Sequence, residues 1–163
     1  MIEGRGEQSL KRYTLLVACT TAFMGPFMGS SINLAIPAIG LEFGSGTLML
    51  NWVVTIYFLA SVAFLVPFGR LADIKGRKKI FIVGITAFSI SSLLCGLAWS
   101  MEMLLIGRVF QGIGSAMLFG TSMAMLTSVF PPQERGRVLG INGTAVYLGG
   151  TLGPVLGGAL THN

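Results

Sequence analysis

The sequence predicts an all-α fold, a polytopic membrane helix bundle with five transmembrane helices. Of its 163 residues 53% are hydrophobic and only 10% are charged, whereas soluble domains carry about 25% charged residues. The apolar residues form runs of about twenty or more, the length that a helix needs to cross a hydrocarbon core of about 30 Å. The charges gather in short segments between these runs. Lipid is therefore the expected solvent for most of the surface.

Five membrane spans follow from the apolar runs. They cover approximately residues 13–39, 48–68, 80–98, 103–129 and 138–160. Gly25, Pro26 and Pro37 interrupt the first span, and membrane helices tolerate such residues where neighbours or cavity water satisfy the freed carbonyls. Two interpretations stay open for this span: a bend beside a functional cavity, or a kink without a ligand. Trp52 and Trp99 stand near span ends, where indole rings favour the membrane interface.

Basic residues predict the orientation of the bundle. They cluster before the first span, between spans two and three, and between spans four and five, whereas residues 40–47 and 100–102 contain no Lys or Arg. Cytoplasmic loops carry an excess of Lys and Arg. We therefore expect a multi-pass protein of the cell membrane with its N-terminus in the cytoplasm and the end of this chain outside. The excess of Lys and Arg in cytoplasmic loops also explains the net charge of +5 better than a nucleic-acid-binding face would.

Met1–Arg5 matches the recognition sequence of a protease used to remove tags, so residues 1–9 are interpreted as a tag remnant and tail, and residues 10–163 as the bundle.

Several features exclude other classes of protein. Cys19 and Cys95 lie within apolar runs and are interpreted as small buried residues. The single histidine, His162, is next to the end of the chain. We expect no enzyme activity, no cofactor and no metal site.

The densest cluster of charge separates spans two and three. It is the stretch GRLADIKGRKK at residues 69–79, with five basic residues. Asp73 is able to cap a helix N-terminus and to pair with Arg or Lys across a bundle interface. The alternative is a solvated loop that only sets the topology.

Arg108 is the ionisable residue that lies deepest in any predicted span, within the stretch RVFQGIG at residues 108–114. Placing a guanidinium at the membrane centre costs about 2.5–3.5 kcal/mol on insertion scales, so the side chain should face a cavity or a partner. It would otherwise reach toward the interface or brace backbone carbonyls.

Two further stretches have a pattern that composition alone does not require. Residues 149–158 read GGTLGPVLGG, which gives span five a smooth glycine face, and Pro154 removes a backbone donor and permits a bend. Residues 30–37 read SSINLAIP and are followed by Trp52, Val53 and Tyr57.

Together the four stretches resemble the major facilitator superfamily, in particular its drug–proton antiporter branch and the fourteen-helix exporters within it. The resemblance implies three groups of site residues. They are an inner-gate motif (Gly69, Asp73, Gly76, Arg77, Lys78), a proton-coupling and cavity group (Arg108, Gln111, Gly112) and an antiporter motif (Gly149, Gly153, Pro154, Gly157, Gly158). The sequence departs from the family pattern at Ile74, where a basic residue is usual, and at Met28, where an acidic one is usual.

The resemblance implies alternating-access export of small hydrophobic or cationic molecules, coupled to proton antiport. Asn33 and Tyr57 would line the cavity with polar groups, and Met24, Phe27 and Met28 would form an adaptable apolar wall. The spans contain no Asp or Glu. The coupling carboxylate would therefore lie in a partner bundle, or coupling would be absent.

The family has twelve or fourteen helices in two bundles, so we expect this chain to be an N-terminal part. The companion would be a missing C-terminal bundle or a second copy of the chain, and the glycine face of span five would pack against it during alternating access. Two alternatives stay open: a non-transporting fragment suited to studies of folding, insertion or assembly, and a half-transporter active only as an oligomer.

Overall fold

The computed structural model describes residues 3–161, with side chains described throughout except at residues 3–5, 156 and 158–161. This range is helical and contains no strand. The helices are α1 (Glu3–Phe43), α2 (Thr47–Lys75), α3 (Arg77–Gly96), α4 (Met101–Val129) and α5 (Pro132–Thr161). The predicted all-α bundle of five helices is confirmed.

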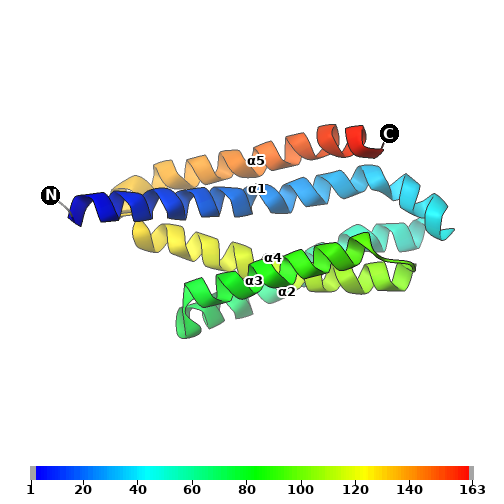
Figure 1. Ribbon diagram of the computed structural model, residues 1–163, viewed down its shortest axis with the longest axis horizontal. Helices are drawn as coiled ribbons and strands as arrows, with labels where there is room; N and C mark the ends of the chain where they lie inside the picture. Colours follow the sequence, from blue (N-terminus) through cyan, green and yellow to red (C-terminus); the bar gives the residue numbers. More distant parts are fainter. Residues whose placement is uncertain (1–2, 162–163) are drawn as a thin grey trace.

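The helices run alternately up and down (Figure 1). The start of α1 and the α2–α3 and α4–α5 connections lie at one end of the bundle, which we call the basic end because the lysines and arginines of residues 11–12, 70–79 and 135–137 lie there. The α1–α2 and α3–α4 connections lie at the opposite end. This alternation agrees with the loop assignment expected from the sequence.

Helices α1 to α4 are each long and apolar enough to cross a membrane. Helix α5 is also long, with 30 residues. Its apolar residues are diluted by glycines and by Asn142 rather than by charge, since residues 138–161 contain no Asp, Glu, Lys or Arg. Its glycines suit close helix packing in a membrane.

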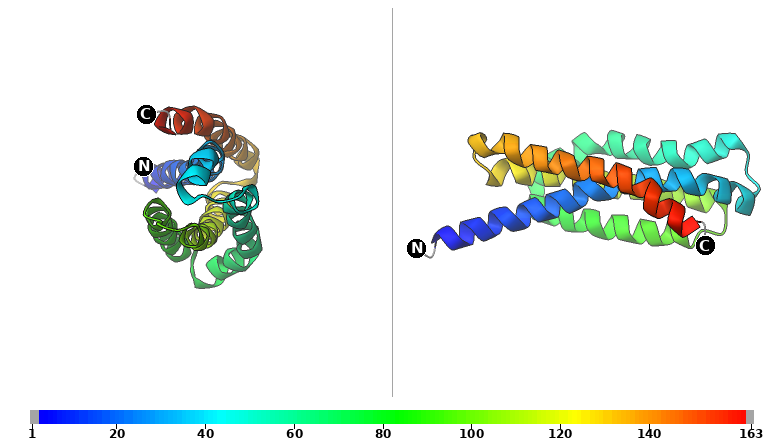
Figure 2. Two further views of the ribbon diagram at one scale, coloured as in Figure 1. Left: turned by 90° about the vertical axis from the view of Figure 1, so that its right-hand side faces the viewer. Right: turned by 90° about the horizontal axis from the view of Figure 1, so that it is seen from above.

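Helix α4 is the centre of the bundle. It packs along α2 and α3 and also contacts α1, while α5 packs mainly along α1 (Figure 2). The inward side of α4 is built from glycine, serine and threonine together with leucines, and many of these residues are buried. Large apolar side chains such as Val62 and Leu93 point outward and are exposed, which is the pattern expected when lipid covers the surface.

The helices extend further than the predicted spans. Glu42 lies in α1 and Asp73 in α2, although the sequence placed both in loops. Backbone hydrogen bonding continues beyond the hydrocarbon layer, so a charged residue can be solvated without ending its helix. The breaks are short: Gly44 and Gly76 turn the chain with φ of 57° and 97°, values that favour glycine.

Residues next to the helix ends determine where α4 and α5 begin. The Ser100 hydroxyl caps α4 by accepting a hydrogen bond from the Met103 N–H at 3.2 Å. Pro132 is the first residue of α5, a position where its missing N–H is not needed.

Residues 3–9, expected as a tag remnant and tail, lie in α1. His162, and the end of the chain that we expected outside, lie beyond the described residues.

Candidate functional site

Helices α2 and α4 approach closely around Gly112. A Cβ added at this glycine would lie 2.5 Å from the Tyr57 carbonyl oxygen. The Ser61 hydroxyl donates to the Gly112 carbonyl at 3.1 Å, and the Tyr57 hydroxyl donates to Ser115 Oγ at 3.0 Å. Hydrogen bonds of this kind help hold membrane helices together. Gly112 therefore has a packing role between α2 and α4.

The first cavity lies between α1, α2 and α4 and has a volume of about 480 Å³. Its lining is mostly apolar, with Phe58, Val62 and Phe119 among the larger side chains. Asn33 and Tyr57 line it too, so the structure brings together two of the predicted polar residues. Mostly apolar walls with a few polar groups are typical of small-molecule sites.

The second cavity lies between α1, α3 and α4, has a volume of about 300 Å³, and contains Arg108. Arg108 is only 6% exposed. Its Nη1 donates to Gln111 Oε1 at 2.9 Å, and Gln111 Nε2 donates to Ser92 Oγ at 2.8 Å. Among the described residues, Arg108 Nε has no hydrogen-bond partner. The guanidinium is therefore buried, held by a neutral amide, and only partly satisfied.

Met28 and Glu42 line this same Arg108 cavity. Met28 occupies the position at which the resemblance led us to expect an acidic residue. Glu42 reaches the cavity because α1 continues to Phe43. Sequence reasoning missed this residue, since hydropathy ended the span at residue 39. The sequence signal that would have found Glu42 is a helical periodicity that continues beyond the apolar run.

The other predicted cavity residues lie elsewhere. Met24 is 40% exposed, and the Phe27 ring stacks on Phe23 with centroids 5.4 Å apart. Neither residue lines the first cavity or the Arg108 cavity. Their assignment to an apolar wall stays a prediction that would require a partner surface.

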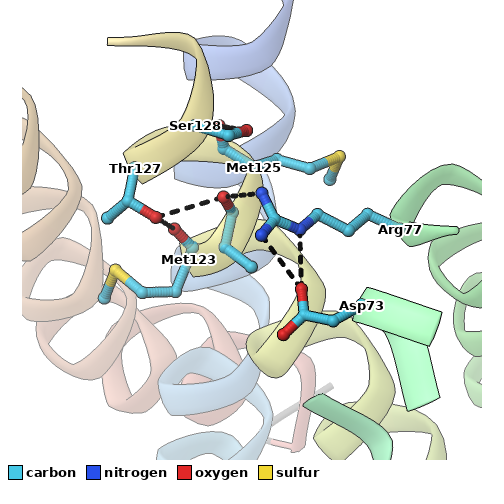
Figure 3. A network of polar contacts seen from close by, with 7 residues as sticks. Asp73, Arg77, Met123, Met125, Thr127 and Ser128 are labelled. Atoms are coloured by element: carbon cyan, nitrogen blue, oxygen red, sulfur yellow. Dashed lines mark hydrogen bonds and ion pairs between the residues drawn. The ribbon is translucent and has the colours of Figure 1, made fainter. Parts of the chain in front are cut away.

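A polar network joins the α2–α3 connection to α4 (Figure 3). The Arg77 Nη2 and Nε atoms donate to Asp73 Oδ1 at 2.9 and 3.0 Å, and Nη1 donates to the Ala124 carbonyl at 2.6 Å. The same carbonyl accepts from the Thr127 hydroxyl at 3.1 Å. Arg77 therefore ties the connection to the last turns of α4.

One expectation about this motif was wrong. Asp73 does not cap a helix N-terminus, because it lies near the C-terminal end of α2, and the N-cap of α3 is Gly76, which has no side chain to offer. The predicted pairing of Asp73 with a basic residue is present. Gly69 is half-buried beside Gly120 of α4, and Lys78 is exposed.

The glycine face of α5 packs within this bundle, against α1. A Cβ on Gly153 would overlap Ser30 Oγ and lie 2.8 Å from the Phe27 carbonyl oxygen, and one on Gly157 would lie 3.2 Å from Ser31 Cα. The Ser31 hydroxyl donates to the Gly153 carbonyl at 3.1 Å. We had expected this face to meet an opposite bundle.

The remaining residues of the predicted antiporter motif divide between the two sides of α5. Gly149 contacts the Phe23 backbone of α1, whereas Pro154 is exposed. Gly158 lies in α5, at a position whose contacts fall outside the described side chains. The side of α5 that remains open to a companion carries Thr151, Leu152, Pro154 and Val155.

A bundle of helices that are long and apolar enough to cross a membrane defines a multi-pass membrane protein. Residues 18–163 match the family model described as Major Facilitator Superfamily, and the chain belongs to this family.

Among similar proteins, the "Riboflavin transporter RibZ" of Clostridioides difficile (strain 630) is 34% identical over 94% of this chain and 34% of its own length. The "Multidrug resistance protein Stp" of Mycobacterium tuberculosis (strain ATCC 25618 / H37Rv) is 38% identical over 79% of this chain and 24% of its own length.

A solved bacterial homologue of the human lysosomal transporter Spinster, in an inward-facing, unoccupied conformation, matches with a TM-score of 0.83 and 26% identity. The match covers 93% of this chain and 32% of that one. The chain thus spans about a third or less of the length of each of these relatives.

Proposed function

We propose that this chain forms one wall of an exporter of small molecules of the multidrug-efflux type. The observation that carries the proposal is the mostly apolar cavity of about 480 Å³ between α1, α2 and α4, with Asn33 and Tyr57 as its sparse polar groups. An apolar site with few directional contacts accepts varied molecules, because little in it has to be matched. The membership in a transporter family and a relative named a multidrug resistance protein support it.

The companion wall would come from a second bundle, either in a longer chain or in another copy of this one. Transport would then proceed by rocking of the two bundles around a site between them. The exposed side of α5 at Leu152, Pro154 and Val155 is where we place that contact. The Arg77 network would stiffen the basic end of this bundle as it moves.

We place the basic end in the cytoplasm and the protein in the cell membrane. The support is the distribution of Lys and Arg, which occur in the predicted inner segments and are missing from residues 40–47 and 100–102. With this orientation the Arg108 cavity, which includes Glu42, opens toward the outer end of the bundle.

We further propose that transport is coupled to protons through the Arg108 cavity. Glu42 is the carboxylate that the structure adds to the lining of this cavity, where it is exposed and forms no ion pair with Arg108 within the described part of the chain. A buried, partly satisfied guanidinium favours a negative charge that approaches it. Glu42 would bind the transported proton, while Arg108 and Gln111 respond to its charge. The alternative that coupling depends on a carboxylate outside this chain predicts no effect of changing Glu42.

The direct test is reconstitution of the purified chain in liposomes with an imposed proton gradient and an apolar cationic dye, alongside its molecular mass in detergent. Gradient-driven efflux by an oligomer supports an exporter whose copies complete each other. A monomer without flux supports the fragment interpretation, in which activity requires a longer chain. Flux that is unchanged by the gradient contradicts proton coupling.

The role of Glu42 has a matched control in Glu102, which is also acidic and lies at the same end of the bundle, in the first turn of α4. We expect Glu42→Gln to lower gradient-driven efflux at least tenfold and Glu102→Gln to leave it within about twofold, as a carboxylate that carries the proton cannot be replaced by an amide. Equal effects of the two substitutions would contradict the assignment.

A further inference from the structure

A third cavity lies at the basic end, between the first turns of α1 and α5, and has a volume of about 560 Å³. Lys11, Arg12, Arg137 and Glu134 supply its charged lining, and Leu15 and Val138 are part of its apolar lining. Toward this end the N-terminal part of α1 diverges from the start of α5 (Figure 2), and Lys11 of α1 still reaches Glu134 of α5 at 3.7 Å. The cavity is separate from both cavities of the proposed transport site.

The charges around this cavity are not balanced. Lys11 Nζ lies 3.5 Å from Glu7 and 3.7 Å from Glu134, so two carboxylates compensate this one lysine. Arg12 and Arg137 also line the cavity, and neither forms a salt bridge within the described part of the chain. Two exposed guanidinium groups therefore flank the cavity, and each still has its full set of donors available.

The base of the cavity is apolar. Val138 and Phe130 belong to a buried cluster with Ala18 and Leu126, and Leu15 packs against it. Leu16, the next residue of α1, is 63% exposed on the outer surface. Cations at the rim thus sit directly above an apolar surface that continues to the lipid-facing side of the bundle.

We infer that this cavity binds the phosphate headgroup of an anionic glycerophospholipid. Arg12 and Arg137 bind the phosphate oxygens, since guanidinium groups form paired, charge-assisted hydrogen bonds to phosphate. The glycerol and the first acyl carbons lie against Leu15 and Val138. Basic pockets between membrane helices are suited to such headgroups, and a free phosphate ion would leave the apolar part of the cavity unused.

The position of the cavity along the helices supports the same occupant. Arg12 precedes the first predicted span, and Arg137 directly precedes the fifth. With these spans, both guanidinium groups would stand at the boundary between hydrocarbon and headgroups, where lipid phosphates lie. The inference depends on the bundle crossing a membrane and does not depend on whether the chain transports anything.

The test is native mass spectrometry of the whole chain, released from detergent micelles containing equal amounts of phosphatidylglycerol and phosphatidylcholine. We compare the unchanged chain with Arg12→Gln/Arg137→Gln and with Arg70→Gln/Lys79→Gln. The control pair removes the same charge from exposed positions at the same end of the bundle, outside the cavity. Circular dichroism of each variant checks that the helices are retained.

We expect retention of phosphatidylglycerol over phosphatidylcholine by the unchanged chain and by the control. In the Arg12/Arg137 variant the preference should fall about 30-fold, as each basic residue near a lipid surface contributes about a factor of five. Equal loss in the two variants would show non-specific charge attraction and would overturn the inference. Absence of any preference in the unchanged chain would overturn it as well.

Soluble glycerol phosphate, added at millimolar concentration, separates the two possible sources of the anion. We expect it to leave the bound phosphatidylglycerol in place, because it lacks the acyl chains that contact Leu15 and Val138. Displacement of the lipid by this competitor would show a simple anion site and would overturn the assignment to a lipid.

Discussion

Arg108 is a buried cation that forms no ion pair among the described residues. Its hydrogen bond goes to the neutral side chain of Gln111, and its Nε has no partner among the described residues. A group that is expensive to bury and incompletely satisfied contributes little to stability, so a functional reason for its presence is the better explanation.

We predict that Arg108→Gln leaves the free energy of unfolding in mixed micelles unchanged or raises it by up to about 3 kcal/mol, because it removes a buried charge. The exposed Arg70→Gln serves as the control and should have no effect. Unfolding by sodium dodecyl sulfate, followed by the fluorescence of Trp52 and Trp99, measures both. A loss of about 3–5 kcal/mol would contradict the account, as that is the effect of breaking a buried ion pair.

Arg77 joins two elements through one side chain. It bonds to Asp73 and to the Ala124 carbonyl of α4, and the charged pair is partly exposed, with the Arg77 and Asp73 side chains 34% and 57% accessible. Exposed pairs contribute about 0–1 kcal/mol. Most of the stabilisation that Arg77 provides therefore comes from its hydrogen bond to the Ala124 carbonyl.

We predict that Arg77→Gln lowers the free energy of unfolding by about 1 kcal/mol, through loss of a charge-assisted bond. Lys78→Gln is the matched control, because Lys78 is exposed and has no salt bridge in the described part of the chain. The same titration measures both. An equal loss in the control would show that general charge, rather than the network, stabilises this end of the bundle.

At the scale of the elements, glycine sets how closely the helices pack. Gly153 and Gly150 differ by three residues on α5, yet only Gly153 meets the backbone of α1. A Cβ on Gly150 would have its nearest neighbour, the Pro26 Cβ, at 4.0 Å. The two positions thus separate packing from the general helix preference of alanine.

We predict that Gly153→Ala destabilises the bundle by about 1–3 kcal/mol, since the added methyl group forces α1 and α5 apart. Gly150→Ala should be neutral or slightly stabilising, because alanine favours helices over glycine. Unfolding titrations of the two variants provide the comparison. A similar loss for both would mean that α5 does not pack on α1 through Gly153.

At the scale of the whole molecule, the sequence predicted the number, order and alternation of the helices but not their faces. Length and hydropathy determine whether a segment crosses a membrane, and both are visible in the sequence. The side that each helix turns toward its neighbours is harder to predict, because apolar residues point both to lipid and to other helices. Met24 was expected in a cavity and is exposed, and Gly153 was expected against a companion bundle and meets α1.

The candidate site was predictable to the extent that its residues are polar. Arg108, Gln111, Asn33 and Tyr57 stand out against an apolar background, and the structure places all four beside cavities. Glu42 was missed because a hydropathy boundary is not a helix boundary. The basic-end cavity was missed because it depends on α1 and α5 being adjacent, a long-range contact that no local pattern shows.

The most direct test of the account is the accessibility of single cysteines in intact cells, in a background of Cys19→Ser and Cys95→Ser. Thr47→Cys lies at the α1–α2 connection, and Lys78→Cys lies just after the α2–α3 connection at the basic end. The account predicts that a membrane-impermeant maleimide labels Thr47→Cys at once and Lys78→Cys only after the membrane is permeabilised. Labelling of Lys78→Cys in intact cells, with Thr47→Cys protected, would contradict the proposed orientation, and labelling of both would contradict a membrane-spanning bundle.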